Sequence, residues 1–263
     1  DIVIFASGIS PSLEGEEMGV NLPGFKKGDR TDIELPAVQR ELIDALHRAG
    51  KKIILVNCSG SPIGLEPETQ KCEAILQAWY PGQQGGKAVA EVLFGDYNPA
   101  GKLPVTFYRN VSQLPDFEDY NMAGRTYRYM QDVPLFPFGY GLSYTTFGYG
   151  KTVLDKNELT AGQSLKLTVP VTNTGKRNGE EVVQVYLRKQ GDAEGPIKTL
   201  RAFKRVSIPA GKTVNVEFDL KDKELEWWDD QSNTVRVCPG NYDIMVGGSS
   251  KEEDLQRTTI AIK

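Results

Sequence analysis

The chain opens on an apolar run, Ile2-Val3-Ile4-Phe5-Ala6, and passes directly into the loop Gly8-Ile9-Ser10-Pro11-Ser12-Leu13-Glu14-Gly15-Glu16-Glu17. The apolar run is typical of a buried strand in an α/β sheet. Ligands of open α/β sheets collect beyond the carboxyl ends of the strands, which is where this loop would lie. A loop that carries three glutamates at such a place predicts acid/base chemistry, with a solvated acidic turn as the alternative.

Strand and helix signals alternate through the rest of the first half. Apolar residues at helical spacing follow Pro36 and stop at Gly50, which predicts a helix. The runs 51–57 and 74–80 read as strands, and residues 86–93 read as a helix with Val89, Ala90, Val92 and Leu93 packed inward. This order predicts a mainly parallel sheet covered by helices on both faces, a three-layer αβα sandwich.

The hydrophobic period changes to two from about residue 150. Apolar residues alternate in roughly seven short segments that are separated by turn signals, which is typical of an antiparallel β-sandwich of fibronectin type. The clearest alternating sets are Leu165, Leu167, Val169 and Val171, then Val183, Val185 and Leu187, then Val214, Val216, Phe218 and Leu220, and then Tyr242, Ile244 and Val246. Residues 99–148 form a bridge too long for a free loop, so we expect it to pack on one or both domains.

Composition excludes several classes of protein. The 263 residues suffice for two ordinary domains, and no apolar run approaches the ~20 residues of a membrane span. The net charge of −4 offers no electrostatic reason to expect nucleic acid. Three cysteines without CxxC spacing and the single histidine, His47, do not suggest a zinc site. Because the chain lacks an initiator Met, we expect it to be the back part of something longer.

Two glycine-containing loops resemble known catalytic or binding turns only superficially. The loop 81–87 does not have Walker spacing, so a tight turn between strand and helix is expected there in place of a nucleotide site. The segment Ser59-Gly60-Ser61-Pro62 does not match a nucleophile elbow, and only His47 could serve it as a base.

Two aromatic segments leave their role open. The stretch Gly124-Arg125-Thr126-Tyr127-Arg128-Tyr129 interleaves cations with aromatic rings, so it could bind a sugar face or clamp the bridge to its neighbours. The pair Trp227-Trp228 could form a carbohydrate platform, or equally an exposed edge of the sandwich or a domain contact.

Taken in order, several segments resemble glycoside hydrolase family 3, particularly its β-xylosidases and β-glucosidases. The resemblance covers nearly the whole chain. Its carriers are Gly8 to Glu16, Gly28-Asp29-Arg30, Leu35-Pro36, Trp79-Tyr80-Pro81-Gly82-Gln83, Leu93 to Pro104, Gly124 to Tyr129 and Pro137 to Thr145.

This resemblance implies a fold and also implies which domain carries each catalytic residue. Residues 1–148 would be most of an α/β sandwich domain, and residues 149–263 would be a fibronectin type III-like domain. A TIM barrel that precedes them in the family carries an aspartate nucleophile, and that barrel is absent here. The family's general acid/base best matches Glu14, with Glu16 as runner-up and Glu17 third, while Asp29 and Arg30 would buttress the loop.

The implied function is that of a retaining exo-β-glycosidase that acts on oligosaccharides. The missing barrel would be the partner of this chain, no metal or organic cofactor would be needed, and the compartment would be periplasmic or extracellular. The fragment alone would be inactive. The rival hypothesis is a non-catalytic carbohydrate-binding or domain-scaffolding module.

Overall fold

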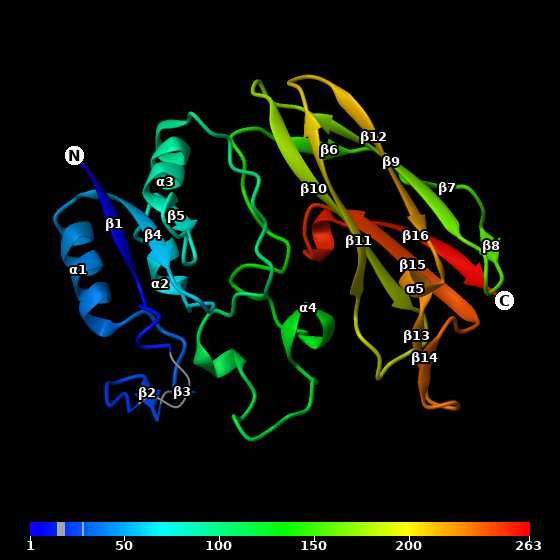
Figure 1. Cartoon of the computed structure of the whole chain (residues 1–263), viewed down its shortest axis with the longest axis horizontal. Coiled ribbons are helices and arrows are strands. Elements are labelled where there is room, and N and C mark those ends of the chain that lie inside the picture. Colours follow the sequence, from blue (N-terminus) through cyan, green and yellow to red (C-terminus); the bar gives the residue numbers. More distant parts are fainter. Residues whose placement is uncertain (15–18, 28) are drawn as a thin grey trace. The chain divides into compact units, whose positions relative to one another are not determined.

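The computed structural model describes residues 1–14, 19–27 and 29–263 and divides them into two units (Figure 1). The first unit contains Asp1–Tyr97, Thr106–Tyr120 and Asp132–Phe136. The second contains Asn98–Val105, Asn121–Gln131 and Pro137–Lys263, so the bridge is shared between the two units.

A parallel sheet organises the first unit. Its strands lie in the order β1 (Ile2–Gly8), β4 (Lys52–Cys58) and β5 (Ala74–Gln77). Strands β1 and β4 pair in parallel along their whole length, from Ile2 with Lys52 to Gly8 with Cys58. The predicted parallel α/β sheet is therefore confirmed. The last strand is shorter than predicted, because Trp79 adopts a positive φ of 56° and turns the chain before Pro81.

Helices flank this sheet unequally. Figure 1 shows α1 (Ala37–Arg48) and α3 (Gly85–Phe94) on opposite sides of the strands. Helix α1 contributes the fully buried Ile43 to a core that includes Ile53 and Leu55 of β4. In α3 the side chains predicted to pack inward are only half-buried, and Phe94 is 80% exposed.

The remaining elements of the first unit are short. They are the hairpin of β2 (Phe25–Lys26) and β3 (Asp29–Arg30), helix α2 (Glu66–Thr69) and the 3-10 turn η1 (Val111–Gln113). Arg40 of α1 donates to the buried Glu68 of α2 over 2.8 Å and to the carbonyl oxygen of Gly64 over 2.6 Å. These charge-assisted hydrogen bonds tie α1 to the segment that follows β4.

Two sheets form the second unit. The first has the order β11 (Thr199–Ile208), β10 (Gly179–Lys189), β15 (Gly240–Gly247), β16 (Gln256–Ile262) and β8 (Glu158–Leu159). The second has the order β12 (Thr213–Leu220), β9 (Leu165–Asn173) and β6 (Phe147–Tyr149), with β7 (Val153–Leu154) also paired to β9. Strands β13 (Trp227–Asp229) and β14 (Thr234–Arg236) form a separate ribbon. The short helices are α4 (Thr126–Tyr129), α5 (Asp222–Leu225) and η2 (Glu252–Asp254).

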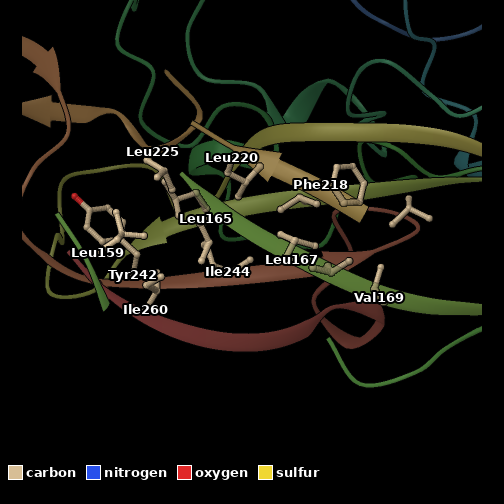
Figure 2. Packing of buried hydrophobic residues seen from close by; sticks show 14 of the residues in the cluster. Leu159, Leu165, Leu167, Val169, Phe218, Leu220, Leu225, Tyr242, Ile244 and Ile260 are labelled. Atoms are coloured by element: carbon tan, nitrogen blue, oxygen red, sulfur yellow. The ribbon is translucent and has the colours of Figure 1, made fainter. Parts of the chain in front are cut away.

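The predicted fibronectin-type sandwich is confirmed, with one departure from the antiparallel pattern. The short β8 pairs with β16 in parallel, through Ala261 with Glu158 and Ile262 with Leu159. The core lies between the two sheets, where alternate residues of each strand point inward. Figure 2 shows this packing: Leu165, Leu167 and Val169 of β9 lie among Phe218 and Leu220 of β12 and Tyr242 and Ile244 of β15.

The two aromatic segments have structural contacts. Tyr127 of α4 stacks on Phe138 with ring centroids 4.3 Å apart, and its hydroxyl accepts a hydrogen bond from the backbone of Leu200 over 3.2 Å. These contacts match the clamp interpretation of residues 124–129. Trp227 is 3% exposed and donates from its indole to Asp192 over 2.6 Å, so it belongs to the core and is not a sugar platform. Its neighbour Trp228 is half exposed.

Candidate active site

Glu14 reaches its position through a sharp turn at the end of β1. Gly8 has a φ of 132°, and a Cβ there would lie 1.8 Å from the carbonyl oxygen of Cys58, so only glycine lets the chain pass β4 so closely. The backbone of Ile9 then donates to that same oxygen over 2.9 Å. Backbone hydrogen bonds from Leu13 and Glu14 to the carbonyl oxygen of Ser10 fold the loop back over the sheet edge.

Three donors from the neighbouring strand ends converge on the Glu14 carboxylate. The backbone N–H of Gly60 donates to Oε2 over 2.8 Å. The Ser61 hydroxyl donates to Oε1 and the Tyr80 hydroxyl donates to Oε2. Ser61 follows β4 and Tyr80 follows β5, so the carboxyl ends of all three parallel strands contribute to one site.

Arg30 of β3 supports this arrangement from the side. Its guanidinium donates to the Ser61 hydroxyl oxygen over 3.3 Å and to the backbone oxygen of Glu34 over 3.1 Å, and lies 6.0 Å from the ring centroid of Phe25. Because Arg30 directs its proton at the Ser61 oxygen, the hydroxyl proton of Ser61 is free to point at Glu14. Arg30 thus contacts Ser61, which is itself a donor to Glu14, and a role of Asp29 and Arg30 in buttressing the loop stays a prediction.

An open pocket of about 590 Å³ lies over these groups. It is lined by Pro11, Glu14, Asp29, Arg30, Gly60, Ser61 and Tyr80. Asp29 lines this pocket too, beside Arg30 in the sequence. The other two predicted candidates, Glu16 and Glu17, lie outside the described residues, as does Gly28 of the Gly28-Asp29-Arg30 motif.

The surroundings of Glu14 hold its carboxyl as an anion. Burial raises the pKa of Glu14, but the hydrogen bonds from Ser61, Tyr80 and Gly60, together with the charge of Arg30, outweigh burial and leave the pKa below its ordinary value. Burial and the adjacent Glu14 carboxylate raise the pKa of Tyr80 to about 12, so the phenol stays protonated at neutral pH. The described residues alone therefore provide a base. An acid would need a further influence that raises the pKa of Glu14.

Gly60 is the residue on which the geometry of this site depends most closely. A Cβ at this position would lie 2.7 Å from a ring carbon of Tyr80 and 2.9 Å from Oε2 of Glu14. We therefore expect Gly60→Ala to push both side chains aside and to destabilise the first unit by about 1–3 kcal/mol. Urea unfolding followed by circular dichroism measures this loss.

The matched control for Gly60→Ala is Gly86→Ala in α3. A Cβ at Gly86 has nothing within 4 Å, and alanine is the better helix former, so this change should stabilise by up to about 1 kcal/mol. Equal effects of the two substitutions would contradict the close packing around Gly60.

Sequence reasoning found Glu14 and Arg30 but did not identify Gly60, Ser61 and Tyr80 as partners of the carboxylate. The available signal was positional: Gly60 and Ser61 come shortly after the predicted strand 51–57, and Tyr80 is the last residue of the predicted strand 74–80. The segment 59–62 does not match a nucleophile turn. The hydroxyl of its second serine, Ser61, instead donates a hydrogen bond to Glu14. The loop 81–87 is a tight turn, in which the backbone of Gly85 donates to Gly82 over 3.1 Å.

Comparisons with known proteins identify relatives for both units. A model of the glycosyl hydrolase family 3 C-terminal domain matches residues 1–144, and a model of the fibronectin type III-like domain matches residues 181–250. A xylan 1,4-beta-xylosidase of Xylanibacter ruminicola is 59% identical over 260 residues, which are 99% of this chain and 30% of that protein. A periplasmic beta-glucosidase of Salmonella typhimurium is 38% identical over 252 residues, which are 91% of this chain and 32% of that protein.

The fold is also similar to solved structures. A β-glucosidase from Erythrobacter marinus matches 100% of this chain and 34% of its own length, with a TM-score of 0.86 and 39% identity. The chain therefore spans about a third of the length of the relatives it matches. Within the described residues, we find no helix whose length and apolar character would let it cross a membrane.

Proposed function

The chain belongs to glycoside hydrolase family 3, and from this premise we propose that it is the C-terminal part of a retaining exo-β-glycosidase. The substrate would be an oligosaccharide from which terminal, non-reducing β-linked xylose or glucose is removed. The observation that carries this proposal is the position of Glu14, which lies in a pocket at the carboxyl edge of the sheet and is held by donors from two further strand ends.

Glu14 is the residue that we assign as general acid/base. It would protonate the leaving-group oxygen as the glycosidic bond breaks, and would later take a proton from the water that releases the sugar. The nucleophile would come from a part of the protein that this chain does not contain. A retaining mechanism requires the two carboxyl groups to lie about 5–5.5 Å apart.

A second carboxylate would also supply the influence on Glu14 that the described residues do not provide. A like charge at that distance disfavours the ionised form and raises the pKa of its neighbour. The lowered pKa of Glu14 in this chain would then move upward once the nucleophile is in place. The complete site would thereby turn a base into a group that can act as an acid.

We extend the proposal to the domain organisation and compartment. Residues 1–148 would constitute the α/β domain with its bridge, and residues 149–263 the fibronectin type III-like domain. The periplasmic beta-glucosidase among the relatives supports a periplasmic or extracellular location.

On this proposal the 263-residue chain alone should be inactive. Without the nucleophile no glycosyl intermediate can form, so release of nitrophenol from aryl β-xylosides and β-glucosides should equal the buffer blank. Turnover well above the blank would contradict the assignment of the nucleophile to a different part of the protein.

The same preparation tests the rival hypothesis of a binding module. Xylan fragments and cello-oligosaccharides are titrated against the chain by calorimetry. Clear binding without turnover would favour a carbohydrate-binding role, whereas the absence of binding agrees with a sugar pocket that lies mainly outside this chain.

A further inference from the structure

The Tyr80 hydroxyl has two acceptors and only one proton. Its oxygen lies 2.8 Å from the carbonyl oxygen of Ile9 and is also within hydrogen-bond distance of Oε2 of Glu14. A phenol donates one hydrogen bond at a time, and an ionised carboxylate and a carbonyl oxygen can both only accept. The two contacts can be satisfied together only if Glu14 itself carries a proton.

We propose that Tyr80 is a positioning residue whose hydroxyl changes its hydrogen-bond partner whenever Glu14 changes its protonation state. The inference rests on the acid/base role proposed above, because such a group must be protonated in one step of each turnover and ionised in the next. When Glu14 is ionised, Tyr80 donates to it, and Oε2 has two donors. When Glu14 is protonated, Tyr80 donates to Ile9.

No heavy atom needs to move between these two states, since turning the hydroxyl about its C–O bond suffices. The Tyr80 proton stays on Tyr80 throughout, in keeping with its raised pKa. Only the Glu14 proton is exchanged, first with the leaving-group oxygen and then with water.

The neighbouring structure keeps both acceptors in place. Ile9 is 2% exposed, and its backbone N–H is bound to the carbonyl oxygen of Cys58. The ring of Tyr80 packs against Gly60, where a Cβ would lie 2.7 Å from a ring carbon of Tyr80. The carbonyl oxygen of Ile9 is therefore held in place as the second hydrogen-bond partner of the Tyr80 hydroxyl.

Several charged groups lie around the hydrogen bond between Tyr80 and Glu14, and the cation among them favours the ionised form of Glu14. Arg30 is the cation that acts on it, and Arg30 is itself influenced by Asp32 and Glu34. Asp29 lines the same pocket. These charged groups are the same in both states. The Tyr80 hydroxyl donates a hydrogen bond to Glu14 only when Glu14 is ionised, so removing that hydroxyl should raise the pKa of Glu14.

The test is a carbon-13 NMR titration of the 263-residue chain with labelled glutamate and tyrosine side chains. In Tyr80→Phe, the midpoint of the Glu14 carboxyl resonance should move upward by about 1 pH unit, because the anion loses one of three donors. In Tyr120→Phe, where the side chain is 90% exposed, the midpoint should stay unchanged. An unchanged or lowered midpoint in Tyr80→Phe would overturn the proposal.

The unmodified chain provides a second measurement that does not depend on a variant folding. The Cζ resonance of Tyr80 should shift with the same midpoint as the carboxyl carbon of Glu14, because its hydrogen-bond partner changes at that pH. A Tyr80 resonance that stays flat through the Glu14 titration would refute the exchange of partners.

These titrations need no catalysis, so their failure is distinguishable from failure of the proposed function. In the full-length enzyme the consequence is kinetic: Tyr80→Phe should move the pH–rate limb governed by the acid/base to higher pH, again by about 1 unit. A purely structural role of Tyr80 would lower the rate without moving that limb.

Discussion

Replacing Glu14 by Gln in the full-length protein should slow the hydrolysis of substrates with poor leaving groups by about 10²–10⁴-fold. An unmodified xylobiose or cellobiose needs a proton on the departing oxygen, which an amide cannot supply. Activated aryl glycosides, whose leaving groups depart as stable anions, should lose much less in the step that forms the intermediate. Comparing kcat/KM for dinitrophenyl and disaccharide substrates measures this difference directly.

The matched control is Glu41→Gln on the exposed side of α1, which makes the same chemical change at a residue that does not line the pocket. Its kinetic constants should equal those of the unmodified enzyme. Equal losses on both substrate types for Glu14→Gln would contradict the assignment and move the acid role to another carboxylate, with Glu16 the next to be tested.

Shortening Ile244 to Ala should be the most destabilising of the changes that we predict, at about 2–5 kcal/mol for the second unit. Ile244 is fully buried in the centre of β15, and Figure 2 shows it between strands of both sheets. The substitution removes apolar surface and leaves a cavity that the two sheets cannot close without losing their register. Urea unfolding followed by tryptophan fluorescence reports on this unit through its buried Trp227.

Val235→Ala in β14 is the control for this experiment. Val235 is 52% exposed, so its truncation should change the free energy of unfolding by no more than about 0.5 kcal/mol. A cost for Ile244→Ala as small as that of the control would mean that the two sheets do not pack as described.

Hydrophobic periods predicted the fold class of both units. The alternation at Leu165, Leu167 and Val169 appears as three buried residues on one face of β9. The apolar run at 53–56 became the central strand of the parallel sheet. The local sequence pattern was less reliable where tertiary packing decides burial. The apolar residues predicted to face inward from α3 are only half-buried, and the adjacent Trp227 and Trp228 differ widely in exposure.

The candidate site was likewise predicted only in part from the sequence. Strand-then-loop order located Glu14 at a sheet edge, and the family resemblance selected it among three glutamates. The hydrogen-bond partners of Glu14 could not be predicted from local sequence, because Ser61 and Tyr80 are 47 and 66 positions away along the chain. Parallel pairing brings such residues together because every strand of a parallel sheet ends at the same edge.

The amino-acid sequence by itself determined the kinds of sheet that this chain forms, because hydrophobic spacing dictates which residues can share a buried face. It also determined which side chain is a candidate proton donor. Only the tertiary structure decided the charge state of that side chain. A pKa depends on the donors and charges within a few ångströms, and residues distant in the sequence supply these here.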